Sequence, residues 1–114
     1  MSHELPDVFG RMLDLWNGGD VDPSDVYATV PEDLAPTVAR YRAAFQDLHW
    51  AIDSWFAADD RYVLRMHAVG THAGDPFRFE GIEVHAVIDD LIVESDQVWN
   101  LGPLYAVVSG RAAD

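Results

Sequence analysis

Apolar residues in the first part of the chain recur every three or four positions, which is the period of one face of an α-helix. The first series comprises Leu5, Val8, Phe9, Met12, Leu13 and Trp16. The stop signal Asn17-Gly18-Gly19 follows and predicts the end of a first helix. A later series predicts a second long helix that ends near Asp47. Its members are Leu34, Val38, Tyr41, Phe45 and Leu48.

A short helical piece is expected between these two helices. Asp22 suits its N-cap and Pro23 its first turn, so it would extend through Tyr27. Pro31 and Pro36 limit its length.

From His49 the period changes to two, as in β-strands. Strands are predicted from residue 49 to 56, 62 to 68, 77 to 88 and 91 to 100, separated by turn-rich connections. Helices followed by an antiparallel meander predict an α+β fold, with the N-terminal helices packed on one face of a four-stranded sheet.

The alternation also predicts which side chains face the helices. The first two strands would contribute Trp50, Ile52, Ser54, Phe56, Tyr62, Leu64, Met66 and Ala68. Pairing Phe56 with Tyr62 would place Asp53 opposite Arg65 on the other face, where His67 also lies. In the third strand, Glu83 is expected near Met66, and His85 near Leu64.

Glu83, His85 and Asp96 form the candidate catalytic set. A two-residue turn at Asp89-Asp90 would place Glu83 opposite Asp96, with all three side chains facing the helices. Apolar surroundings favour a protonated carboxyl group and a neighbouring imidazolium favours an ionised one, so such a set could exchange a proton beside a carbonyl group.

A structural alternative exists for this set. Glu83 and His85 could form a satisfied buried pair while Asp96 points outward. A register change of one residue would have that effect, and it would bring Ser95, Gln97 and Trp99 inward instead.

Aromatic side chains are numerous enough to line a pocket for a flat hydrophobic ligand, although most residues of this kind serve as core. The candidate substrate-binding residues are Trp16, Tyr41, Trp50, Ile52, Met66, Gln97 and Trp99. Phe79 is a further candidate for the pocket wall.

Composition narrows the possible partners. The 114 residues suit a single domain over residues 1–114. A formal charge of -13, from 7 basic and 20 acidic residues, argues against nucleic-acid and anionic membrane partners. The chain has no cysteine and no apparent targeting segment, so a soluble cytoplasmic protein is expected.

Cofactor and metal sites are not expected. His67 and His85 lie on opposite faces, and His3, His49 and His72 lie near element ends or in turns. Three ligands therefore do not converge. Neither a nucleophilic serine motif nor a lysine-containing phosphate loop is present.

Several stretches resemble the SnoaL-like polyketide cyclases of the NTF2-like superfamily. Residues 9–20 (FGRMLDLWNGGD) are similar to the first helix of that family, and residues 41–48 (YRAAFQDL) to the helix before its first long strand. Residues 69–74 (VGTHAG), 81–84 (GIEV) and 92–94 (IVE) follow in the family's order. The resemblance implies a cone of helices over a curved sheet, a pocket inside it, and a homodimer through the outer sheet face.

Two departures from the family pattern stand out. The segment between Tyr27 and Leu34 is short and lacks the strand that usually carries a His-Asp-Pro stretch to the pocket mouth. In the last strand, Gln97 and Asn100 occupy positions where the family has acids. An amide does not exchange protons near neutral pH, so the family's acid/base role does not transfer to these two residues.

The leading hypothesis is a cofactor-independent cyclase or isomerase for a hydrophobic, carbonyl-containing small molecule such as a polyketide. His85 and Asp96 would move protons, Glu83 would orient His85, and Tyr41, Trp50 and Met66 would shape the cavity. One alternative is a non-catalytic module that binds a ligand or a protein. Another is an epoxide-opening hydrolase.

Overall fold

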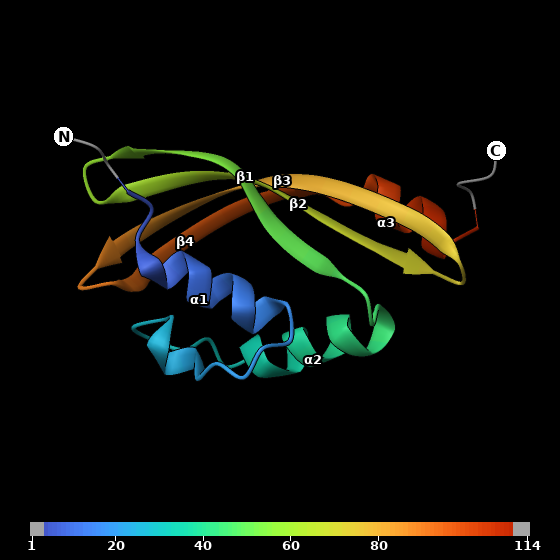
Figure 1. Ribbon diagram of the computed structural model, residues 1–114, viewed down its shortest axis with the longest axis horizontal. Coiled ribbons are helices and arrows are strands. Elements are labelled where there is room, and N and C mark those ends of the chain that lie inside the picture. The colour runs from blue at the N-terminus through green and yellow to red at the C-terminus, as the bar shows by residue number, and fades with distance from the viewer. Residues whose placement is uncertain (1–3, 111–114) are drawn as a thin grey trace.

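A computed structural model describes residues 4–110, so His3 lies outside the described part of the chain (Figure 1). The helical elements are α1 (Asp7–Trp16), the 3₁₀-helix η1 (Pro23–Asp25), α2 (Leu34–Ala44) and α3 (Gly102–Val108). The strands are β1 (His49–Ala58), β2 (Arg61–His72), β3 (Asp75–Ile88) and β4 (Leu91–Asn100).

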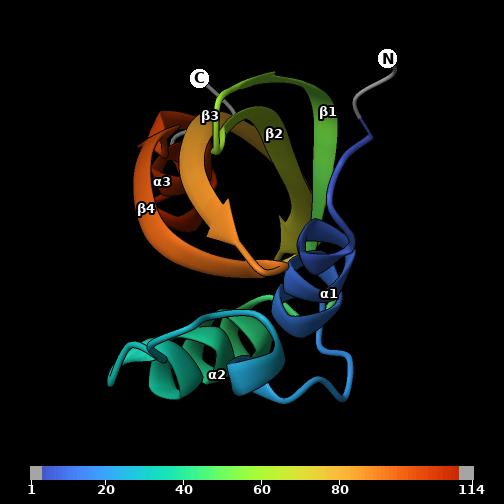
Figure 2. The same cartoon turned by 90° about the vertical axis from the view of Figure 1, so that its left-hand side faces the viewer.

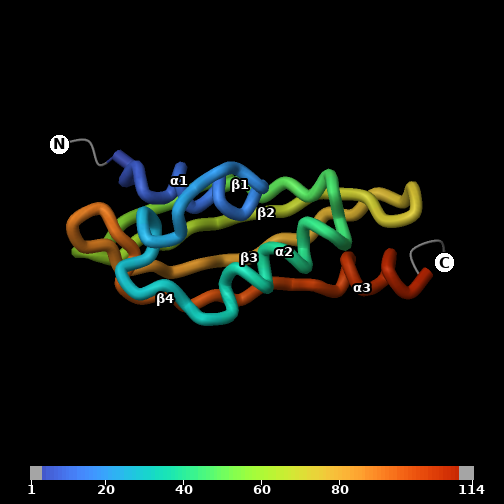
Figure 3. The backbone as a smooth tube through the Cα atoms, turned by 90° about the horizontal axis from the view of Figure 1, so that it is seen from below, coloured from blue at the N-terminus to red at the C-terminus, as the bar shows by residue number. Residues whose placement is uncertain are grey.

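The strands form one antiparallel sheet in the order β1-β2-β3-β4. The sheet is strongly curved, and α1 and α2 lie below its concave side (Figure 2). Seen from below, α1 lies near β1 and α2 runs obliquely to the strands, while α3 lies at the far end beyond β4 (Figure 3). The predicted α+β arrangement of helices on a curved four-stranded antiparallel sheet is confirmed.

The stop signal after α1 also connects the helix to the sheet. Asn17 follows the last helical residue, and its side-chain amide donates to the carbonyl oxygen of Trp50 at 3.0 Å. Its side-chain oxygen accepts from the Trp50 backbone N–H at 2.7 Å. These two hydrogen bonds hold the start of β1 against the end of α1.

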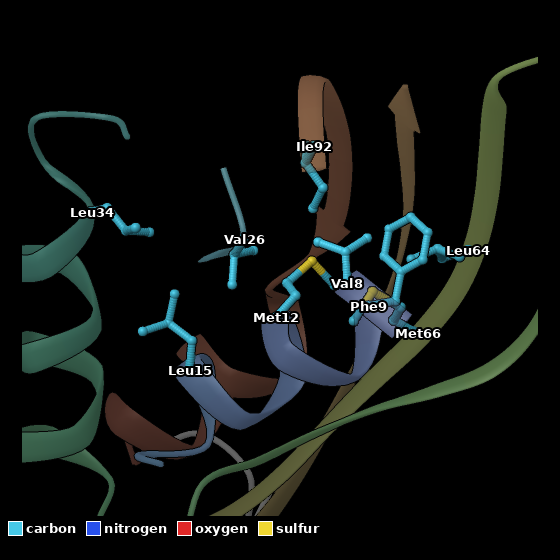
Figure 4. Packing of buried hydrophobic residues seen from close by; sticks show 9 residues of the cluster. All are labelled: Val8, Phe9, Met12, Leu15, Val26, Leu34, Leu64, Met66 and Ile92. Atoms are coloured by element: carbon cyan, nitrogen blue, oxygen red, sulfur yellow. The ribbon is translucent and has the colours of Figure 1, made fainter. Parts of the chain in front are cut away.

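Two apolar clusters fill the concave side. The first joins α1 to β2, β4 and the α1–α2 connection (Figure 4). It consists of Val8, Phe9, Met12, Leu15, Val26, Leu34, Leu64, Met66 and Ile92. The second consists of Phe45, Leu48, Trp50, Ala68, Phe77, Phe79, Leu104 and Val107. Leu104 and Val107 belong to α3, which the sequence pattern did not predict.

The predicted register of the first hairpin is wrong between the turn and a bulge in β1, and it holds beyond the bulge. Ile52 pairs with Met66 and Ser54 with Arg65, so Asp53 is an extra residue that reverses the alternation after it. On the turn side of the bulge, Phe56 pairs with Val63 instead of Tyr62, and it is 62% exposed although an inward position was predicted. The turn is the two residues 59–60.

The expected alignment of β3 with β2 is displaced by two residues. Glu83 lies opposite Leu64 and His85 opposite Tyr62, whereas Met66 and Leu64 had been predicted as their partners. Because side chains alternate with a period of two, this displacement leaves both polar groups on the concave face.

A second bulge, in β4, determines which polar residues face the helices. Ile88 pairs with Leu91 across the Asp89-Asp90 turn, as predicted, but Ala86 pairs with Glu94 and Val87 with Ile92. Val93 is therefore the extra residue, and the alternation reverses after it.

The β4 bulge makes the predicted pairing of Glu83 with Asp96 wrong. Glu83 lies opposite Gln97, and His85 lies opposite Ser95. Asp96 pairs with Val84 and is exposed on the convex face. The alternative register holds, with Ser95, Gln97 and Trp99 on the concave side.

Candidate functional site

A chain of hydrogen bonds connects β3 and β4 on the concave face. Glu83 Oε1 lies 2.7 Å from His85 Nε2, and Glu83 Oε2 accepts from the Trp99 indole N–H at 3.0 Å. His85 Nδ1 lies 2.7 Å from Ser95 Oγ. Both carboxylate oxygens and both ring nitrogens therefore have a partner, which is what burial of such groups requires.

The Glu83–His85 pair is enclosed by apolar groups. Glu83 is 8% and His85 3% exposed, and the Phe9 ring of α1 lies 5.4 Å from the imidazole between ring centroids. Removing either polar partner would leave the other buried without its main contact. The pair therefore stabilises one side-chain arrangement as well as providing groups that can carry a proton.

Gly81 gives Trp99 its place against the sheet. The two residues are paired across β3 and β4, and a Cβ atom at Gly81 would lie 2.3 Å from the Trp99 ring. Only glycine leaves room for the indole at this position. The position of Trp99, in turn, brings its N–H to Glu83.

Two neighbouring cavities, here called the inner chamber and the mouth, lie between α1, α2 and the concave face and share the lining residues Trp16, Thr37, Glu83 and Gln97. The inner chamber, of about 220 Å³, is mostly apolar. Its walls are Met12, Leu13, Trp16, Thr37, Tyr41, Trp50, Met66, Glu83, Gln97, Trp99 and Leu101.

The mouth, of about 420 Å³, is more polar than the chamber. It is lined by Trp16, Tyr27, Thr29, Pro31, Asp33, Leu34, Thr37, Glu83, His85, Ile92, Val93, Glu94, Ser95 and Gln97. Glu83 and Gln97 line both the chamber and the mouth. The buried carboxylate would therefore lie beside the middle of a ligand whose apolar part is in the chamber and whose polar part is in the mouth.

Aromatic rings wall the inner chamber. The Trp16, Tyr41 and Trp50 centroids are 5.7 to 6.3 Å apart, and Trp50 lies 5.1 Å from Trp99. Each of these pairs is steeply tilted, in the edge-to-face manner that aromatic rings prefer. Within residues 4–110, Trp50 Nε1 is the one buried side-chain nitrogen or oxygen that lacks a hydrogen-bond partner.

Tyr27 adds a hydroxyl group to the mouth. Burial raises the pKa of Tyr27 above its ordinary value. The Trp16 indole N–H, which donates to the hydroxyl oxygen at 3.2 Å, acts in the opposite direction, and the nearby Glu83 charge adds to the rise. Tyr27 therefore stays a neutral phenol near pH 7.

The predicted site residues divide into three groups. Glu83 and His85 come together, and six of the predicted substrate-binding residues line the chamber: Trp16, Tyr41, Trp50, Met66, Gln97 and Trp99. Ile52 does not line it and packs against the first apolar cluster instead. Asp96 lies on the other face of the sheet, so its predicted position in the site is wrong.

Tyr27 and Thr37 line the site although the sequence did not single them out. Tyr27 lies in a segment without a repeating pattern. It makes a parallel bridge with Ile92, and the Ala28 N–H donates to the Ile92 carbonyl oxygen. Thr37 is a small polar residue in the predicted second helix, and only the position of that helix brings it to the cavity.

His67 and Arg65 lie on the convex face, as predicted. His67 Nδ1 is 2.7 Å from an Asp53 oxygen, and Arg65 pairs with Glu80 at 3.6 Å. Within the described residues, no group of three or more His, Asp or Glu side chains could hold a metal ion. None of the helices within residues 4–110 has both the length and the apolar character needed to cross a membrane.

The family model for the SnoaL-like polyketide cyclases matches residues 7–106, nearly the whole of the described chain. The chain belongs to this family. Among curated proteins, none matches this SnoaL-like chain significantly.

Solved structures share the fold. A candidate polyketide cyclase from Acidithiobacillus ferrooxidans superposes with a TM-score of 0.74 at 19% identity, over 96% of this chain and 99% of that one. A protein with a ketosteroid isomerase-like fold from Catenulispora acidiphila, in complex with trimethylamine, superposes with a TM-score of 0.72 at 16% identity, over 93% of this chain and 95% of that one.

A third similar structure is AclR, a candidate hydroxylase from Streptomyces galilaeus. It superposes with a TM-score of 0.64 at 26% identity, over 75% of this chain. The match covers 63% of AclR, which is less than two thirds of that protein's length. The predicted NTF2-like fold is therefore confirmed.

Proposed function

We propose that this SnoaL-like protein is a cyclase or isomerase that moves a proton next to a carbonyl group of a hydrophobic small molecule, with Glu83 as the base. One observation carries the proposal: the Glu83 carboxylate, although 8% exposed, lines both the apolar chamber and the polar mouth. A buried acid in a cleft is a marker of catalytic sites.

In the first step, Glu83 takes a proton from the carbon beside the carbonyl group. The electrons of the broken C–H bond form the C=C bond of an enolate, and the carbonyl oxygen takes the negative charge. Gln97 lies opposite Glu83 on the neighbouring strand, and its amide N–H donates a hydrogen bond to that oxygen.

In the second step, Glu83 returns the proton. Return to another carbon gives an isomer. Alternatively, the enolate carbon attacks a second carbonyl group of the same molecule, a C–C bond closes a ring, and the proton goes to the new alkoxide oxygen. His85 orients the Glu83 carboxylate through the hydrogen bond at its Nε2, and its Nδ1 is hydrogen-bonded to Ser95 at the mouth.

Asp96 has no place in this scheme because it lies on the convex face. Gln97 stands where the resemblance gives the family an acid, so the proton-moving group is on β3 instead of β4. The amide cannot act as the base, but it remains a hydrogen-bond donor.

Glu83→Gln tests the proposal because it keeps the shape of the side chain and removes the base. Wild-type protein should accelerate exchange of the α-protons of 2-tetralone in D₂O, followed by NMR, and Glu83→Gln should reduce that rate by about 10²-fold or more. Circular dichroism checks that the variant is folded. Equal rates for the two proteins, or no acceleration by the wild type, would contradict the proposal.

A second candidate, a non-catalytic binding module, is favoured by one observation. Both oxygens of Glu83 and both nitrogens of His85 already have partners within the protein. Such a module would bind 2-tetralone without accelerating its exchange. The same NMR experiment therefore separates the two functions.

We also infer a homodimer through the convex sheet face. Ile82 and Val98 are directly paired there, and they are 51% and 78% exposed. Phe56, at 62%, is a further exposed apolar residue on this face, and the Arg65–Glu80 ion pair lies beside Ile82. Exposed apolar surface of this kind marks interaction sites.

A further inference from the structure

The inner chamber combines aromatic walls with a buried acid. Trp16, Tyr41 and Trp50 lie within 6.3 Å of one another between ring centroids, and Trp99 extends this wall toward Glu83. The faces of aromatic rings carry partial negative charge and attract cations, most strongly where water is excluded. A carboxylate at the edge of the same chamber adds a full negative charge when it is ionised.

Charges around the rest of the cavity have the same sign. Asp33 and Glu94 line the mouth, and neither Lys nor Arg is among the residues within 4–110 that line the chamber or the mouth. His85 is the one lining residue that can become positive, and its Nε2 is bonded to Glu83. A carboxylate or phosphate group would therefore enter without a compensating charge, at a high desolvation cost.

We propose that the inner chamber recognises a small tertiary or quaternary ammonium group on the substrate. Alkyl groups on nitrogen make such a cation bulky and weakly hydrated, so it loses less hydration on burial than a primary ammonium group does. The inference rests on the proposed function only in treating this cavity as the substrate site. The ammonium group occupies the chamber, and the carbonyl group lies between Glu83 and Gln97.

Three soluble probes of nearly the same shape test the charge preference directly. Choline carries the trimethylammonium group, 3,3-dimethylbutan-1-ol has a neutral carbon in place of the nitrogen, and 3,3-dimethylbutanoate is an anion. Isothermal titration calorimetry on the wild-type protein should give at least about tenfold tighter binding of choline than of the alcohol, and no binding of the anion. Equal or tighter binding of the alcohol, or no binding of choline, would overturn the inference.

Tyr41 variants test whether the aromatic wall provides the preference. Tyr41 is half-buried on α2, and its ring lies 5.7 Å from that of Trp50. Tyr41→Leu should lower choline affinity at least threefold and leave the alcohol nearly unchanged, whereas Tyr41→Phe should retain choline binding. Tyr105→Leu is the matched control because Tyr105 is 63% exposed on α3 and does not line the cavity. Equal loss of both ligands in Tyr41→Leu would contradict cation recognition by this ring.

Failure of this inference is distinguishable from failure of the proposed function. The titrations measure binding alone and need no turnover, while the exchange of 2-tetralone protons uses a neutral ketone. If the protein binds the neutral alcohol more tightly than choline and still accelerates proton exchange, the ammonium site is contradicted and the proposed enzymatic function is supported. If the protein binds choline tightly but does not accelerate proton exchange, the cation site is supported and the proposed catalytic role is contradicted.

Discussion

The two faces of β3 and β4 combine apolar and polar residues in opposite ways. On the concave face, Glu83 and His85 form a buried polar pair among apolar residues. On the convex face, Ile82 and Val98 are exposed apolar residues beside the charged pair of Glu80 and Arg65.

Pairs of charged groups on the two faces contribute differently to stability because one pair is buried and the other is exposed. A buried pair cannot exchange its partner for water, whereas an exposed pair can. The bulge at Val93 decides which residues of β4 belong to which face, because it reverses the alternation between Ile92 and Ser95.

The largest expected effect is the difference in stability between two variants, one that loses a buried carboxylate on the concave face and one that loses an exposed carboxylate on the convex face. Glu83→Leu leaves His85 and the Trp99 indole N–H buried without their acceptor, so it should lower the free energy of unfolding by about 3 kcal/mol. Glu80→Leu, on a side chain that is 51% exposed, should change it by less than about 1 kcal/mol. Urea denaturation measures both, and similar losses would contradict the contrast between the faces.

Gly81→Ala should have the next largest effect. Its Cβ would lie 2.3 Å from the Trp99 ring, so the ring must move away from Glu83, at a cost of about 1–3 kcal/mol in unfolding free energy. Tryptophan fluorescence should change with it.

Gly10→Ala is the matched control for Gly81→Ala. Gly10 lies within α1 and has no atom near its added Cβ, so alanine there should stabilise the protein by about 0.5–1 kcal/mol. Stability of Gly81→Ala equal to that of the wild type would show that Trp99 does not need its present position.

Val98→Glu should convert the inferred dimer to a monomer with little loss of stability. Val98 is 78% exposed, so the folded monomer tolerates the charge, while two copies facing each other would repel. Light scattering gives the mass. Val108→Glu, at a residue 46% exposed on α3, is the control that should keep the dimer. A monomeric wild-type protein would contradict the inferred dimer.

The smallest expected effect concerns the turn before the β4 bulge. The Arg11 guanidinium bonded to Asp90 holds the pKa of that carboxyl group below its ordinary value, and the Val8 N–H at the start of α1 contributes. A lowered pKa in the folded state means that the stabilisation is present above the unfolded pKa of about 4 and is lost as pH falls through the folded value.

Asp90→Asn tests this effect. It should cost less than about 1 kcal/mol in unfolding free energy at pH 7, because the Arg11–Asp90 pair is well exposed. The difference from the wild type should vanish at the lowest pH at which both proteins stay folded. Urea titrations at several pH values measure it, and a cost that does not change with pH would contradict the ionic explanation.

Much of the fold could be predicted from the sequence because its longer elements bury one face. α1 and the four strands lie close to where the sequence predicts them, Asp22 caps η1, and Asn17 follows α1. The second helix ends at Ala44, earlier than the predicted end near Asp47. α3 was missed because seven residues with two buried side chains give too short a pattern. The bulges at Asp53 and Val93 were missed because a single extra residue leaves no trace in the residue types around it.

The candidate site was predicted in part for the same reasons. Glu83 and His85 are two residues apart on one strand, so their shared face did not depend on the register between strands. The position of Asp96 did depend on it, and a bulge of one residue reversed the prediction. Tyr27 was missed because its segment has no period and reaches the site through backbone contacts with Ile92.

The central claim is that the β4 bulge puts Gln97, and not Asp96, beside Glu83, the base of the proposed reaction. The most direct measurement compares Asp96→Asn and Gln97→Leu in the 2-tetralone exchange experiment. Asp96→Asn should stay within about twofold of the wild-type rate, and Gln97→Leu should lose about tenfold or more because the enolate oxygen loses its donor. A large loss in Asp96→Asn with an unchanged Gln97→Leu would contradict the claim.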